Sequence, residues 1–116
     1  MQLLLDVSPR PTAILAATDL LAAGALKAAL GKGVAIPAEL SLIGFGEGAV
    51  ADNLPIALTS LRPPIAEMAF AASTELACAD SPRQPAEFFA SLVPRASTGP
   101  APVRPPLPAM QLDSQQ

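Results

Sequence analysis

The sequence predicts an α/β fold built on a parallel βαβ unit, followed by a second helix and a closing strand. Two apolar runs of strand length lie at residues 13–17 and 41–45, and a capped, glycine-terminated helical segment separates them. Parallel strands need a long crossover connection, which is usually a helix. The crossover is expected to be right-handed, so that both strands lie side by side in one sheet.

The first strand is expected at residues 13–17, where an unbroken apolar run predicts coverage on both faces. Thr18 and Asp19 then offer side-chain oxygens to the free amides of a helix that begins near Leu20. The helix is expected to stop at residues 31–33, because glycine adopts positive φ without a steric penalty. Its apolar residues surround almost the whole helix, which predicts burial within the fold or against a second subunit. They are Leu20, Leu21, Ala25, Leu26, Ala29 and Leu30.

The second strand is expected at residues 41–45, and residues 46–57 are predicted to form a loop because glycines and Pro55 prevent a sustained helix. A short strand follows at 58–61. A second helix is expected over about 64–79, with proline in its first turn. Its apolar positions repeat at the spacing of one buried face, and a last strand is expected at 88–93. These positions are Ile65, Met68, Ala69, Ala72, Leu76 and Ala79.

Residues 99–116 are rich in proline, and this composition predicts a disordered or polyproline-like tail. The run at 105–108 superficially fits a ligand of proline-binding modules. We interpret it as a linker, because proline tracts chiefly resist packing.

The charge and length of the chain exclude several classes of function. The 116 residues carry ten acidic and seven basic side chains and a net charge of −3, so this chain alone is not expected to bind nucleic acid. No apolar run approaches the roughly 20 residues of a membrane span, which predicts no membrane partner. The N-terminal residues lack the pattern of a signal peptide, and we therefore expect a cytoplasmic protein.

The sequence contains few residues that could act in catalysis or bind a metal. The chain has no histidine, which excludes Ser-His-Asp and Cys-His arrangements and histidine metal sites. Cys78 is a single cysteine among alanines and is expected to be a buried, inert thiol. We therefore expect no metal, no cofactor and no enzymatic activity.

One motif keeps a different class of function open. Residues 44–49, GFGEGA, match the dinucleotide-binding pattern G-x-G-x-x-A after a strand. The pattern binds pyrophosphate only where a helix N-terminus follows, whereas here the run 52–55, DNLP, follows. A nucleotide-dependent α/β enzyme is therefore the less favoured alternative.

Several segments together resemble the effector-binding domain of LacI/GalR-type bacterial transcription regulators, which has a periplasmic-binding-protein-like fold. The resemblance covers residues 3 to 98 approximately. It rests on PTA at 11–13, ATD at 17–19, AGALKA at 23–28, IPAELSLIGF at 36–45, LTSLRPPI at 58–65 with Glu67 and Met68, and LVPRAST at 92–98.

The resemblance implies that residues 1–98 are the C-terminal part of such a sensor domain and that residues 99–116 are a tail outside it. It implies a transcription regulator whose helix-turn-helix DNA reader is not encoded in this chain. A small-molecule effector, such as a sugar or a related metabolite, would be the partner, and the full-length protein would be a homodimer. Leu21, Lys27 and Leu54 are the candidate dimer-interface residues, with core packing as the alternative for each. A fragment of a periplasmic-type sugar-binding transport protein is the first alternative, ahead of the nucleotide-dependent enzyme.

The resemblance also implies an effector site at Thr18, Asp19, Phe45, Gly46 and Glu47. Sugar-binding members typically have asparagine at the position of Thr18 and aspartate at that of Gly46. For Asp19 the interpretation as a helix cap is favoured over the interpretation as a ligand group, because it directly precedes the apolar helix. Gly46 has no side chain, so ordinary sugar recognition is in doubt, although Glu47 offers a carboxylate one residue later and Phe45 offers an apolar wall.

Overall fold

The computed structural model describes residues 1–46, 48–77 and 85–101. It contains a four-stranded sheet in the order β1-β2-β3-β4. Its strands are β1 (Ala13–Leu15), β2 (Ser41–Phe45), β3 (Thr59–Arg62) and β4 (Ser91–Val93). The helices are α1 (Gln2–Asp6), α2 (Asp19–Gly31), α3 (Ala49–Asp52) and α4 (Ile65–Ala77).

The predicted βαβ unit is confirmed. Strands β1 and β2 are parallel, with Ala13 opposite Ser41 and Leu15 opposite Ile43, and α2 connects them. Strand β3 continues the parallel sheet, whereas β4 pairs antiparallel to β3, with Ser60 opposite Val93. The fold is therefore an α/β arrangement with a parallel βαβ unit, as the sequence predicts.

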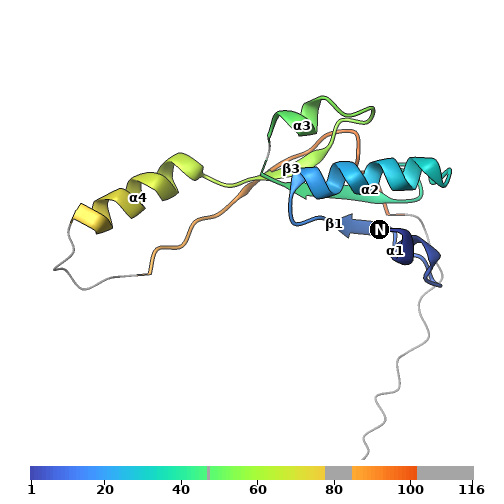
Figure 1. Ribbon diagram of the computed structural model, residues 1–116, viewed down its shortest axis with the longest axis horizontal. Helices are drawn as coiled ribbons and strands as arrows, with labels where there is room; N and C mark the ends of the chain where they lie inside the picture. Colours follow the sequence, from blue (N-terminus) through green and yellow to red (C-terminus); the bar gives the residue numbers. More distant parts are fainter. Residues whose placement is uncertain (47, 78–84, 102–116) are drawn as a thin grey trace, which may run out of the picture.

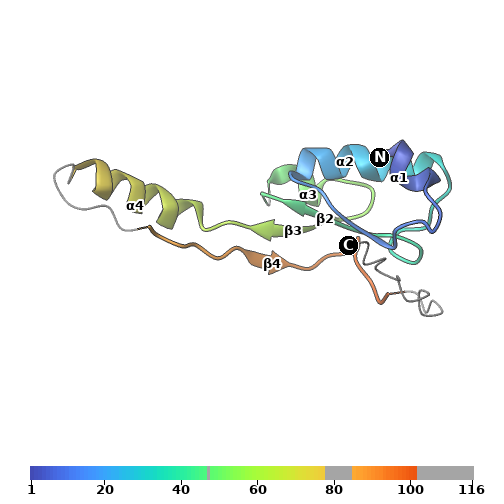
Figure 2. The same cartoon turned by 90° about the horizontal axis from the view of Figure 1, so that it is seen from below.

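Helix α2 covers one face of the sheet, with α1 and α3 beside it (Figures 1 and 2). Leu26 and Leu42 are almost completely buried between the helix and the sheet, and each such side chain contributes roughly 1.5–3 kcal/mol through burial. This core also contains Ala22, Ala25, Ala51 and Leu58. A smaller cluster near the end of α2 contains Leu5, Ala29, Val34 and Leu40.

The prediction that the first strand is covered on both faces is wrong. Strand β1 alternates, with Ile14 half-buried toward the core and Ala13 and Leu15 exposed. On the same side of the sheet, Phe45 of β2 is 41% exposed. Alternation follows from the pleat of a strand, and no helix of the described chain packs on this second face.

The apolar surface of α2 is also less buried than predicted. Leu20, Leu21 and Leu30 are exposed, whereas the alanines and Leu26 face the core. The burial seam of α2 is thus made of small residues, and these residues let the helix lie close to the strands.

Helix α4 stands apart from the rest of the fold, beyond the ends of β3 and β4 (Figures 1 and 2). We call α4 and the extended segment 85–90, which runs back to β4, the α4 arm. The sequence predicts a buried face here, but no residue of α4 is buried, and Ile65 and Leu76 are 62% and 78% exposed. This prediction is wrong because burial needs a partner surface, and within the described chain only the extended segment after residue 84 runs beside the helix. Ala79, which the same prediction included, lies outside the described residues.

Smaller corrections concern the ends of elements and two short helices. The predicted loop at 46–57 contains one helical turn, α3, which starts after Gly48 and buries Ala51. Helix α1 was not predicted, because a five-residue segment shows no periodicity, although it buries Leu5. The last strand is shorter than expected. Cys78 and the tail beyond residue 101 lie outside the described residues.

Candidate functional site

The predicted effector residues lie at the carboxyl end of the parallel strands. Thr18 follows β1 by three residues, and Phe45 and Gly46 lie at the end of the adjacent β2. In open α/β sheets, ligands bind in the crevice outside the carboxyl ends of the strands. The structure therefore brings four of the five predicted residues, which include Asp19 at the start of α2, to the edge where such folds bind ligands. Glu47 lies outside the described residues.

Thr18 is the N-cap of α2. Its Oγ1 accepts a hydrogen bond of 3.2 Å from the backbone N–H of Leu21, which satisfies one of the free amides of the first turn. The hydroxyl is exposed, and its own hydrogen can be donated to a second group. One side chain thus fixes the helix start and presents a donor at the edge of the sheet.

Asp19 is not the helix cap, and the prediction that favoured this role is wrong. It is the first residue of α2 and is only 6% exposed. Its Oδ1 accepts a 2.6 Å hydrogen bond from the hydroxyl of Ser60, and its Oδ2 accepts a 2.9 Å bond from the N–H of Gly48. The carboxylate therefore points into the protein and connects three elements.

Gly46 has a φ of +124°, a conformation that side chains rarely adopt. Its N–H donates to the carbonyl of Leu61 at 2.9 Å, so the backbone beyond β2 is held against β3. Among the described residues that are not its chain neighbours, a Cβ at Gly46 would have only Asp19 Oδ2 within 4 Å, at 3.8 Å. This glycine thus leaves open space where a larger side chain would stand.

The dinucleotide-like motif has a structural explanation. A Cβ on Gly44 would overlap Asp19 Oδ1 and would lie 2.8 Å from Leu58 Cδ2, so glycine is needed for packing. A helix does follow the motif, contrary to the argument from sequence, but α3 has only four residues. The motif therefore gives no support to nucleotide binding.

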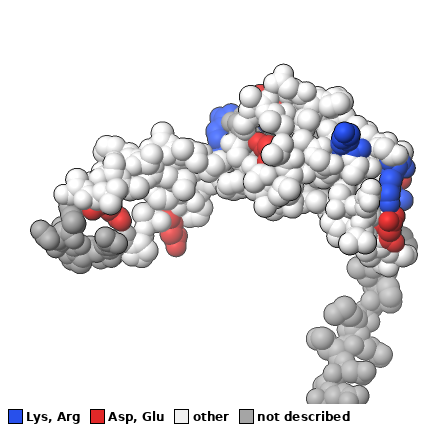
Figure 3. All heavy atoms as spheres, in the orientation of Figure 1, with Lys and Arg blue, Asp and Glu red and all other residues white. Residues whose placement is uncertain are grey.

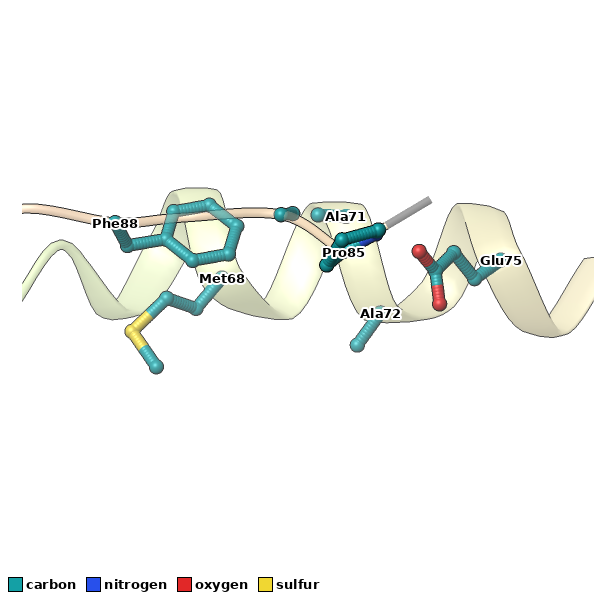
Figure 4. Close-up of a pocket in the computed structure, with 7 residues that line it drawn as sticks. Met68, Ala71, Ala72, Glu75, Pro85 and Phe88 are labelled. Carbon is teal, nitrogen blue, oxygen red and sulfur yellow. The ribbon is translucent and has the colours of Figure 1, made fainter. Parts of the chain in front are cut away.

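Of the candidate interface residues, Leu21 and Lys27 lie in α2, whereas Leu54 follows α3 and packs in part against the core. Lys27 and Leu54 line one hollow between α2 and the segment after α3, whereas Leu21 is 60% exposed and does not line it. The hollow is mostly apolar and is completed by Leu20, Ala23, Gly24, Leu26, Leu30 and Pro55. A second hollow lies between α4 and the segment after residue 84, where Phe88 and Met68 face one another (Figure 4).

A buried polar network between β2, β3 and the segment 95–98 was not predicted from the sequence. The hydroxyl of Ser97 accepts from the N–H of Thr59 at 2.8 Å and donates to the carbonyl of Leu42. Arg95 donates to the carbonyl of Leu58 at 3.0 Å and contacts Asp52 at 2.9 Å. The available signal was the occurrence of polar Thr59 and Ser60 at adjacent positions of a predicted strand, so that one of them faces each side of the sheet.

The described residues show no other clustered chemistry. They contain no group of three or more metal-ligating side chains, and none of their helices has the length and apolarity to cross a membrane. Lysine and arginine are scattered on the visible face rather than gathered in one patch (Figure 3).

Comparison with known families identifies the family of this domain. Residues 1–98 match the family described as periplasmic binding protein-like domain. The chain belongs to this family. The resemblance seen in the sequence is thereby confirmed, and this periplasmic binding protein-like domain covers the sheet, α2 and the α4 arm.

The curated relatives of this periplasmic binding protein-like domain are transcriptional regulators. The HTH-type transcriptional regulator GalS of Salmonella typhimurium is 50% identical over 66 residues, which is 57% of this chain and 19% of the relative. MalR of Streptomyces coelicolor, also an HTH-type regulator, is 33% identical over 95 residues, or 78% of this chain and 28% of the relative. The chain thus spans 19–28% of the length of these two proteins.

Two solved structures that are similar to this chain are also transcriptional regulators. A LacI family transcriptional regulator from Bifidobacterium animalis subsp. lactis is 33% identical with a TM-score of 0.75, covering 87% of this chain and 38% of that protein. A LacI family regulator from Lactobacillus casei with bound glucose is 31% identical with a TM-score of 0.67, covering 84% of this chain and 36% of that protein. The periplasmic binding protein-like domain described here therefore corresponds to just over a third of each of these two structures.

Proposed function

We propose that this chain is the ligand-sensing portion of a LacI/GalR-type transcriptional regulator and that it has no catalytic role. The observation that carries the proposal is the position of Thr18, Phe45 and Gly46 at the carboxyl ends of adjacent parallel strands. The regulators named above support it, one of them with bound glucose. A cytoplasmic location is part of the proposal.

The proposed ligand is a small-molecule effector of the sugar or related metabolite class. Thr18 would offer its hydroxyl, and Phe45, which is 41% exposed, would offer an apolar wall. The carboxylate of Asp19 is already shared between Ser60 and Gly48, so it would support the site rather than contact the effector. Glu47, which lies outside the described residues, is proposed as the acidic group in place of the missing side chain at Gly46.

The first experiment maps the binding surface of this chain by NMR while glucose is added up to millimolar concentrations. The amide shifts of Thr18, Phe45, Gly46 and Gly48 should change together, because they lie at one end of the sheet. The hollow beside α4 is the internal control, and Ala71 and Phe88 should not move. Shift changes confined to that hollow, or to residues scattered over the surface, would contradict the proposed site.

A second experiment asks whether Gly46 weakens the recognition of neutral sugars. The substitution Gly46→Asp introduces a carboxylate, and a charged hydrogen bond would raise the affinity for glucose roughly tenfold to a hundredfold. Because φ at Gly46 is +124°, any side chain there is strained. Gly46→Ala is therefore the matched control for strain. Equal glucose affinities of the two variants by calorimetry would contradict the assignment.

Operator binding by this chain alone is expected to be absent, because it is acidic and its basic residues are few. A mobility-shift assay at low salt is the hardest test, since electrostatic affinity for DNA is greatest there. Tight binding that weakens with added salt would contradict this part of the proposal.

A dimer through the outer side of α2 completes the proposal. Lys27 and Leu54 share a mostly apolar hollow, and the exposed Leu21 lies on the same helix. In the full-length regulator, for which the dimer is proposed, Leu54→Asp should shift the weight-average mass in sedimentation toward the monomer. An unchanged mass of a dimeric parent chain would place the contact elsewhere.

A further inference from the structure

The carboxylate of Asp19 lies directly over the strand pair β2–β3. Gly44 and Ser60 are opposite each other in these strands, and a Cβ on Gly44 would occupy the position of Asp19 Oδ1. The absence of a side chain at Gly44 therefore lets the first turn of α2 approach the sheet. The approach places a charged group, 6% exposed, above the end of two parallel strands.

Asp19 uses each of its two oxygens for a different segment. Oδ1 accepts from Ser60 Oγ at 2.6 Å, and Oδ2 accepts from the Gly48 N–H at 2.9 Å. The partners are 41 and 29 residues away in the chain. Among side chains, only a carboxylate supplies two acceptor oxygens at once, and hydrogen bonds to a charged group are the stronger ones.

The two partners belong to parts of the molecule with different roles. Gly48 is the N-cap of α3 and is two residues from Gly46 in the proposed effector site. Ser60 lies in β3, and the next residues of β3 lead through Arg62 into the α4 arm. A further bond, from Gly46 N–H to the carbonyl of Leu61, links the same two segments at 2.9 Å.

We propose that Asp19 is a positioning residue that couples the glycine segment at the end of β2 to strand β3, and through β3 to the α4 arm. Its functional meaning rests on the proposed sensor function: a displacement of Gly46 and Gly48 by an effector would move the carboxylate and, with it, Ser60. In this proposal Asp19 does not contact the ligand. It holds the backbone of the segment from Gly46 to Gly48, and this segment contacts the effector.

Coupling makes a prediction that simple pairwise bonding does not. Ser60 fixes the rotation of the Asp19 carboxylate, so removal of the Ser60 hydroxyl should weaken the distant bond from Gly48 as well. A purely local bond between Asp19 and Gly48 would not respond to Ser60. The two alternatives are therefore separated by one variant, Ser60→Ala.

The experiment measures amide hydrogen exchange of Gly48 by NMR in the unliganded 116-residue chain, relative to the amide of Leu26 in the core of α2. Asp19→Ala should raise the relative rate roughly 10- to 100-fold, because a charge-assisted hydrogen bond is lost. Ser60→Ala should raise it at least about threefold. Asp19→Asn should raise it less than Asp19→Ala does, since its amide still accepts from Gly48, although without the charge, and can donate to Ser60.

Asp6→Asn is the matched control. It removes the same charge from an exposed pair with Lys32, at 2.6 Å and at the other end of α2, and should leave the relative rate unchanged. Ser60→Ala and Asp19→Asn carry the test even where Asp19→Ala fails to fold. An unchanged Gly48 rate in Ser60→Ala would overturn the coupling. An equal rise in Asp6→Asn and Ser60→Ala would overturn it too, because the effect would then follow overall stability.

No ligand enters this measurement. A failure of the coupling would leave the sensor proposal standing, and a failure to bind glucose would leave the coupling standing. The two results are therefore independent.

Discussion

Helices α2 and α4 are each 13 residues long and mainly apolar, yet they have opposite environments. Five residues of α2 are buried, including Leu26 at 1% exposure, whereas α4 buries none and leaves Leu76 78% exposed. The difference lies in what each helix faces. Periodicity indicates which side of a helix is suited to burial, but the surface that buries it must come from elsewhere in the fold.

The largest contrast is expected between two leucines. Leu26→Ala removes a fully buried side chain of α2 and should lower the free energy of unfolding by roughly 2–5 kcal/mol. Leu76→Ala in α4 should change it by less than about 0.5 kcal/mol, because this side chain is exposed. Urea unfolding followed by circular dichroism measures both values. A cost for Leu76→Ala as large as that for Leu26→Ala would mean that α4 is packed in solution.

A smaller contrast is expected between two glycines. Gly44→Ala pushes a methyl group against Asp19 and Leu58 and should cost roughly 1–3 kcal/mol by forcing α2 away from the sheet. Gly24→Ala, in the middle of α2, has nothing within 4 Å and should stabilise the chain by about 0.4–1 kcal/mol. Thermal unfolding of the two variants should therefore shift in opposite directions. Equal shifts would remove the argument that Gly44 makes room for α2.

The smallest contrast is between two threonines. Thr18→Ala removes the N-cap bond to Leu21 and should cost roughly 0.5–2 kcal/mol. Thr74 lies inside α4 and donates its hydroxyl to the carbonyl of Phe70 at 2.9 Å, without a capping role. Because alanine has the higher helix propensity, Thr74→Ala should be neutral or stabilising by up to about 0.7 kcal/mol. A cost for Thr74→Ala that matches Thr18→Ala in urea unfolding would contradict this difference.

The sequence predicted the parts of the fold that follow from local chemistry. The βαβ order, the glycine stop near residue 31 and the parallel pairing of β1 with β2 all rest on signals within a few residues. Burial of Ile65 was predicted from the same signals and is wrong, because Ile65 has no partner surface in the described chain. Leu20 was predicted to be buried within the fold or against a second subunit, and it is exposed in the single chain. Helix propensity and spacing carry no information about that partner.

The sequence predicted where the candidate site residues lie in the fold, whereas their roles in binding an effector stay a prediction. Thr18, Phe45 and Gly46 came from a resemblance, and they meet because carboxyl ends of parallel strands share one edge of the sheet. The sequence offered both Thr18 and Asp19 as cap residues, and Thr18 is the cap. Both residue types cap helices, and only the fold shows which oxygen reaches Leu21. The bond from Asp19 to Ser60 spans 41 residues, and no local pattern specifies it.

The antiparallel return of β4 determines how the α4 arm is attached to the sheet. The chain leaves the sheet along β3 and comes back to it along β4, with Leu61 opposite Leu92 and Arg62 opposite Ser91. The arm is therefore tethered to the sheet at both of its ends, by two strands that are hydrogen-bonded to each other. A change in the position of β3 thus reaches the arm through both of its connections.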